Sequence, residues 1–158
     1  MNMKQTTWTV LAEKAQSAVR DAQQLVSDAR HRVSKLEQSL AHLDQLRDDY
    51  IARYNEAQKE AHSISDTITY RKFLEHLRGL RGRVEGQLQD ANLKLADAKA
   101  ELVKALREQA KMDAMVERDK RNQALAIAKQ EQRAMEIGRR LLEPLARVQS
   151  GDGRSPQR

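Results

Sequence analysis

The chain has 158 residues, of which 33% are charged and only 3% are aromatic, so we expect a single domain without a large globular core. The net charge is +6 and cysteine is absent, which excludes thiol chemistry and permits contact with nucleic acid, acidic proteins or anionic lipid. There is no apolar run that could span a membrane and no recognisable secretory signal, so we expect a soluble, cytoplasmic protein.

The first predicted element is a helix over about residues 8–62. Hydrophobic side chains recur there with a spacing of seven, in two series that are offset by four and then three residues. The series are Trp8, Ala15, Ala22, Ala29, Leu36, Leu43, Tyr50, Ala57 and Ala12, Val19, Val26, Val33, Leu40, Arg47, Tyr54, Ala61. This pattern is the a/d seam of a coiled coil, with Arg47 as its one charged exception.

The segment HSISDTIT, residues 62–69, predicts a turn at about 63–67. Short polar side chains favour turns and helix caps, and Ser65, Asp66 or Thr67 can cap the helix that follows. A short loop between two long helices predicts an antiparallel hairpin, folded so that the numbers of facing residues add to about 130. One continuous helix is the alternative, which the cluster of β-branched and capping residues disfavours.

The second predicted helix covers about residues 68–143. Its seam consists of Tyr70, Leu77, Val84, Ala91, Ala98, Ala105, Met112 and of Leu74, Arg81, Leu88, Leu95, Leu102, Gln109, Val116. The seam fades after Val116, where the first helix no longer supplies a partner, so residues from about 123 to 143 are expected to project as a single helix. Pro144 is expected to end or kink that helix.

The expected fold class is all-α. The chain is expected to form a long two-helix antiparallel coiled-coil hairpin over residues 1–148, with a C-terminal helical overhang. We expect a disordered tail over residues 149–158, because they are rich in glycine and polar residues. From Ser150 onward this stretch reads SGDGRSPQR.

The sequence contains no constellation of residues that indicates catalysis. Its four histidines, His31, His42, His62 and His76, are scattered, and no glycine-rich strand-to-helix phosphate loop is present. A hairpin of two helices also offers no water-excluded pocket that would perturb a carboxylate pKa. We therefore expect a non-enzymatic protein without a cofactor or a bound metal.

Three glycines inside the second predicted helix form a candidate site for partner contacts. Gly79, Gly82 and Gly86 are spaced three and four residues apart, so they share one stripe at the outward f and b heptad positions. They are either tolerated glycines that soften the helix or a side-chain-free strip for a partner backbone. The stretch GLRG also matches the GXXG of an RNA-clamping loop, but the chain has no predicted strand for that module. Three arginines near the glycines favour an acidic partner: Arg78, Arg81 and Arg83.

Two further groups of apolar residues are candidates for partner contacts. The aromatic residues near the turn, Tyr50, Tyr54, Tyr70 and Phe73, form either a hydrophobic plug or a partner surface. Near the C-terminus, several apolar residues lack an intramolecular partner, so they favour either a partner groove or self-association. These residues are Leu125, Ile127, Met135, Ile137 and Leu141.

Three stretches resemble the FliJ family of flagellar export proteins, over about residues 1–143. They are LRDDYIARYNEA before the turn, TYRKFLEHLRGLRGRVEGQL after it, and VERDKRNQALAIAKQEQRAMEIGRRL near the C-terminus. The resemblance implies a cytoplasmic component of type III flagellar export, at the cytoplasmic face of the inner membrane. It also implies a coiled coil similar to the central stalk of rotary ATPases. The related stalk proteins of injectisomes are the nearest alternative.

The resemblance also implies partners. The terminal ends of the helices would dock in the hexameric export ATPase FliI, and the other end would contact the export gate protein FlhA, which provides peripheral membrane association. Export chaperones are further implied partners. The family's gate contact falls on Phe73, Leu77, Leu80 and Val84, although Val84 replaces a usual polar residue and Leu77 and Val84 are also seam positions. A general structural or chaperone coiled coil is the alternative, and a nucleic-acid partner is not expected because acidic residues interrupt every basic stretch.

Overall fold

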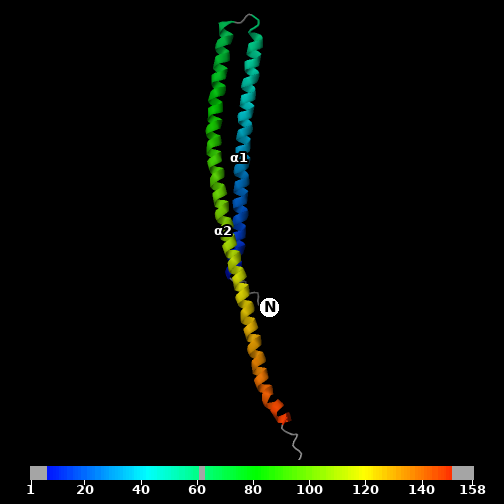
Figure 1. Cartoon of the computed structure of the whole chain (residues 1–158). Helices are drawn as coiled ribbons and strands as arrows, with labels where there is room; N and C mark the ends of the chain where they lie inside the picture. Colours follow the sequence, from blue (N-terminus) through cyan, green and yellow to red (C-terminus); the bar gives the residue numbers. More distant parts are fainter. Residues whose placement is uncertain (1–6, 61–62, 151–158) are drawn as a thin grey trace, which may run out of the picture. The chain divides into compact units, whose positions relative to one another are not determined.

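The computed structural model describes residues 7–60 and 63–150, and these residues form two helices, α1 (Thr7–Ala57) and α2 (Ile64–Ser150). Within the unit Glu13–Gln109 the helices run antiparallel and side by side (Figure 1). No described residue lies in a strand. The predicted all-α class and the coiled-coil hairpin are confirmed.

The connection between the helices lies earlier in the chain than the sequence predicted. Helix α1 ends at Ala57 rather than at about residue 62, and α2 begins at Ile64 rather than at about residue 68. The cap of α2 is Ser63, whose Oγ accepts a hydrogen bond from the Asp66 backbone N–H at 3.3 Å. The expected caps were therefore wrong, because Ser65, Asp66 and Thr67 all lie inside the first turn of α2. The predicted seam residue Ala61 lies outside the described residues.

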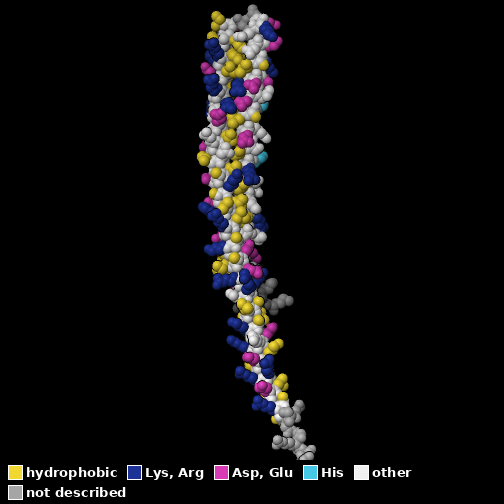
Figure 2. Space-filling view, in the orientation of Figure 1, with side chains coloured by type: hydrophobic (Ala, Val, Ile, Leu, Met, Phe, Trp, Pro, Cys, Tyr) yellow, Lys and Arg dark blue, Asp and Glu magenta, His cyan; other side chains and the backbone are white. Residues whose placement is uncertain are grey.

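The predicted seam forms the core of the hairpin. The most deeply buried side chains all lie at seam positions, and they are Ala15, Val19, Ala22, Val26, Val33, Leu36, Leu77 and Ala91. Apart from the exposed Arg47, the other described seam residues between Glu13 and Gln109 are half-buried. Figure 2 shows hydrophobic side chains gathered along the line where the two helices meet. The heptad periodicity thus identifies the buried face of each helix correctly.

The centre of the core also shows the register of the hairpin. Val33 and Leu36 of α1 pack with Ala91 of α2, and Val84, Leu88 and Leu95 pack against them. Asp44 faces Arg81 and Tyr54 faces Tyr70, so the numbers of facing residues add to about 125. The predicted value of about 130 was too high, since the chain turns several residues before Ser65.

The second unit combines the start of α1, Thr7–Ala12, with α2 from Ala110 onward. Leu11, Ala12, Met112 and Val116 are half-buried there, whereas every residue from Arg121 to Val148 except Gly138 is exposed. This change matches the predicted fading of the seam after Val116. The observed overhang covers residues 121–148, whereas the sequence predicted about 123–143.

Helix α2 continues through Pro144 to Ser150, so of the two effects predicted for Pro144, the end of the helix is wrong and the kink stays a prediction. Because proline has no backbone N–H, Pro144 cannot donate the helical hydrogen bond to the carbonyl of Arg140. Of the predicted tail, residues 149 and 150 continue α2, and residues 151–158 lie outside the described residues.

Candidate functional site

Four aromatic side chains close the end of the hairpin next to the connection. The ring of Tyr50 lies 4.1 Å from that of Phe73 and 5.3 Å from that of Tyr70, and Tyr54 stacks on Tyr70 at 3.6 Å. The Tyr54 hydroxyl lies 3.2 Å from Thr67 Oγ1 and accepts a hydrogen bond from Gln58 Nε2 at 2.8 Å. The rings pack mainly on one another, which agrees with the predicted hydrophobic plug.

An ion pair crosses the seam beside this aromatic plug. Arg81 Nε donates to Asp44 Oδ1 at 2.7 Å, and Arg81 Nη2 donates to Asp44 Oδ2 at 3.4 Å. Arg81 also contacts Glu85, and Asp44 contacts Arg47 Nη1 at 3.6 Å. The hydrogen bond from Arg81 lowers the pKa of Asp44, and the same bond raises the pKa of Arg81.

A groove with a volume of about 340 Å³ surrounds this ion pair, and we call it the arginine groove. It is lined by Leu43, Asp44, Arg47 and Ile51 from α1 and by Leu74, Leu77, Arg78 and Arg81 from α2. Its floor is apolar, and its rim carries three arginines against one aspartate. Arg78 makes no hydrogen bond or ion pair with any described residue, so its guanidinium is available to an acidic group.

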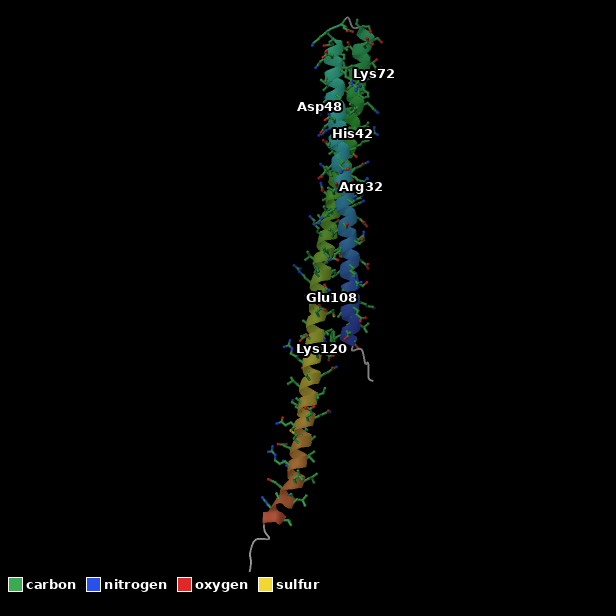
Figure 3. The ribbon with its side chains drawn as sticks, turned by 90° about the vertical axis from the view of Figure 1, so that its right-hand side faces the viewer. Arg32, His42, Asp48, Lys72, Glu108 and Lys120 are labelled. Atoms are coloured by element: carbon green, nitrogen blue, oxygen red, sulfur yellow. The ribbon has the colours of Figure 1, made fainter. Side chains whose placement is uncertain are left out.

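A second groove, with a volume of about 560 Å³, also contains Leu43, and we call it the Leu80 groove. It is lined by Lys35, Gln38, Ser39, His42, Leu43, Leu80 and Val84. Three apolar side chains form its floor, and Lys35 and His42 add polar groups from α1. Figure 3 labels His42 and shows its side chain on the outside of the hairpin. This groove suits a partner that inserts apolar side chains.

The structure does not bring the four predicted gate residues together in one exposed patch. Leu77 is only 5% exposed and belongs to the core, and Phe73 packs on Tyr50 inside the plug. Leu80 and Val84 are half-buried and line the Leu80 groove together. The sequence analysis did not predict that Lys35 and His42 of α1 line this groove with Leu80 and Val84. The correct register between the helices would have revealed it.

The glycine strip has the orientation that the heptad register predicted. Gly79, Gly82 and Gly86 are exposed, and a Cβ atom added to any of them would meet no other atom within 4 Å. Their backbone is helical, so none of them is required for a special conformation. The exposed Arg78 lies near the strip with Arg83, whereas Arg81 belongs to the seam.

The apolar residues predicted near the C-terminus are exposed on a part of α2 that no other described helix covers. They are Leu125, Ile127, Met135, Ile137 and Leu141. Leu142, Leu145 and Val148 are exposed in the same stretch, and the last two follow Pro144, where the sequence predicted an end or a kink of the helix. These eight side chains form the largest run of exposed hydrophobic residues along the described part of α2.

Metal-ligating clusters and membrane-spanning stretches are both absent from the described residues. Among residues 7–60 and 63–150, no three metal-ligating side chains lie close enough to hold an ion. Neither of the two described helices contains a stretch apolar enough to cross a membrane. The candidate site consists of two grooves, a glycine strip and an uncovered apolar helix face.

Comparison with known proteins identifies one family. A family model described as "Flagellar FliJ protein" matches residues 5–141, which is nearly the whole chain. No curated protein and no solved structure shows a match.

Proposed function

Since the chain belongs to the FliJ family and is a component of the flagellar export apparatus, we propose that it acts there as a non-enzymatic stalk and adaptor. In this proposal, residues 121–148 dock in the hexameric export ATPase FliI, and the grooves near the connection contact the export gate protein FlhA. Export chaperones for late substrates are further partners. The protein couples these partners mechanically and allosterically and carries out no bond chemistry of its own.

The observation that carries this proposal is the uncovered apolar face of α2. Leu125, Ile127 and Ile137 are each more than half exposed on a helix without a described partner. Removing such side chains from water stabilises a complex by roughly 25 cal/mol for each Å² of apolar surface buried. A ring of protein subunits around the helix would bury these side chains from several directions at once.

The gate contact is supported by the Leu80 groove. Leu80 and Val84 share its floor with Leu43, so an apolar side chain of the partner would replace water over all three. Phe73 and Leu77 act indirectly in this proposal, because Phe73 packs on Tyr50 and Leu77 is buried in the core, so both hold α2 against α1. Arg78 and Arg83 lie on the exposed face of α2 and would attract acidic groups of the partner.

The ATPase contact is tested by measuring ATP hydrolysis and hexamer formation by purified FliI with and without the full-length chain. We expect the chain to raise the hydrolysis rate, and we expect Leu125→Gln with Ile127→Gln to remove most of this increase. Leu25→Gln with Leu93→Gln is the matched control, because these two residues are also exposed but lie on the hairpin. A chain that changes neither the rate nor the hexamer population would overturn the stalk proposal.

The gate contact is tested by measuring how tightly the cytoplasmic domain of FlhA binds the full-length chain. We expect Leu80→Gln to weaken binding about tenfold, since it places an amide on the groove floor. Leu93→Gln is the control for an equally conservative change at an exposed site of the same helix. Unchanged binding by the Leu80 variant, with circular dichroism equal to wild type, would exclude this groove as the contact.

A further inference from the structure

We propose that residues 133–148, the C-terminal amphipathic segment of α2, bind an anionic lipid surface by lying in the plane of its interface. The inference does not rest on the proposed stalk function. It rests on how apolar and charged side chains are distributed around this segment. The whole segment belongs to one unit of the structure.

The apolar face of the segment is wide. At 3.6 residues per turn, its apolar residues occupy roughly half of the helix circumference. They are Ala134, Met135, Ile137, Gly138, Leu141, Leu142, Leu145, Ala146 and Val148. Leu141 is 70% exposed and Val148 is 73% exposed, so this surface is open to solvent. A single partner helix covers only a narrow a/d stripe, whereas a membrane interface accepts a face of this width.

The charged residues are arranged to suit an anionic surface. Arg139 lies at one border of the apolar face, and Arg133 and Arg140 lie at the other. Glu136 and Glu143 lie in the middle of the polar face, where they would point away from the membrane. An arginine at the border can lay its aliphatic stem along the apolar phase while its guanidinium reaches lipid phosphates.

The three border arginines are also available for lipid. Arg133, Arg139 and Arg140 form no ion pair with any described residue, so no internal interaction would have to break before they bind headgroups. Figure 2 shows Lys and Arg side chains and hydrophobic side chains exposed along this part of α2. Charge complementarity therefore favours anionic lipid over a neutral surface.

Lipid binding would compete with the proposed docking in the ATPase. Met135, Ile137 and Leu141 belong to both surfaces, and one helix face cannot be buried in lipid and in protein at the same time. The two proposals are nevertheless separable, because Leu125 and Ile127 lie outside the amphipathic segment. Vesicle binding can also be measured without any ATPase.

The first experiment measures the orientation of the segment on vesicles. The chain contains no cysteine, so Leu145→Cys and Glu143→Cys each create a single site for an environment-sensitive dye on the full-length protein. With vesicles of equal phosphatidylglycerol and phosphatidylcholine, we expect a blue shift at position 145 and none at position 143. Pure phosphatidylcholine should give little shift at either position. No shift at position 145, or equal shifts at both positions, would overturn the proposal.

The second experiment measures co-flotation of the full-length chain with the same vesicles. We expect Leu141→Gln with Leu142→Gln to reduce binding at least tenfold, and the matched Leu25→Gln with Leu93→Gln to leave it unchanged. Arg139→Gln with Arg140→Gln should reduce binding to anionic vesicles by roughly 30-fold, because each basic residue near the surface contributes a severalfold effect.

Circular dichroism checks that each variant keeps the helix content of the wild type. If Leu141 and Leu142 are needed for folding, the arginine variant still tests the proposal, since exposed arginines contribute little to the fold. Unchanged flotation by either folded variant would overturn lipid binding. If the wild-type chain stimulates FliI but floats with neither kind of vesicle, this face binds protein and not lipid. That result would also overturn the proposal of lipid binding.

Discussion

Arg81 and Asp44 join the two helices across the seam, with Arg81 Nε 2.7 Å from Asp44 Oδ1. Arg81 stands at a heptad position that is usually apolar, so the pair replaces a hydrophobic layer of the coiled coil. A charged residue in a seam typically specifies register rather than adding much stability. We therefore expect this pair to fix which residues of α1 and α2 face each other.

The first prediction concerns the pH dependence of this pair. Because Arg81 lowers the pKa of Asp44 in the folded state, the pair stabilises the fold at pH values above the unfolded pKa, about 4. This contribution is lost as the pH falls through the lower, folded pKa. The difference in Tm between wild type and Asp44→Asn should therefore be largest near neutral pH and should close under acidic conditions.

The control for this prediction is Asp48→Asn. Asp48 pairs with the adjacent Arg47, both side chains are exposed, and such a pair contributes little to stability. The Tm of the Asp48→Asn variant, measured by circular dichroism, should stay close to that of the wild type at every pH. A gap between wild type and Asp44→Asn that persists at pH 2 would contradict the assignment.

The second prediction separates two neighbouring leucines of α2. Leu77→Ala should lower the free energy of unfolding by about 2–4 kcal/mol, because it leaves a cavity in the seam. Leu80→Ala should cost about 1 kcal/mol, because its side chain is only half-buried. Urea unfolding measures both values, and equal costs would show that Leu80 belongs to the core as much as Leu77 does.

The third prediction concerns the glycine strip. Gly82→Ala with Gly86→Ala should raise the free energy of unfolding by about 1–2 kcal/mol, since both residues are helical and the added methyl groups enter open space. Thermal unfolding measures this gain. The same variant then distinguishes the two interpretations of the strip: weaker FlhA binding by the stabilised protein indicates a docking role, and unchanged binding indicates tolerated glycines.

The fourth prediction concerns the cap of α2. Ser63→Ala should destabilise the hairpin by about 0.5–2 kcal/mol, because it leaves the Asp66 backbone N–H without its side-chain acceptor. Ser65→Ala is the matched control and should change stability by less than about 0.5 kcal/mol, since Ser65 lies within the first turn of α2. If Ser65→Ala lowers stability more than Ser63→Ala does, then Ser65 is the cap of α2, as the sequence pattern predicted.

Much of the candidate site could be predicted where it depends on helix periodicity. The outward position of Gly79 and the inward position of Leu77 both follow from their place in the heptad, and both are confirmed. The Leu80 groove could not be predicted in the same way. Its floor combines Leu80 with Leu43 of the other helix, and a register error of a few residues changes which side chains meet.

The sequence by itself determined the two helices, their buried faces and the family, because heptad spacing and motif residues are local properties of the chain. Only the tertiary structure decided that α1 ends at Ala57, that Ser63 caps α2 and that Asp44 meets Arg81. The turn-forming side chains Ser65, Asp66 and Thr67 lie inside α2, whereas the chain between the helices begins with Gln58, Lys59 and Glu60, so local preference alone misplaces the turn. The choice is made by long-range packing, which aligns the apolar layers of one helix with those of the other.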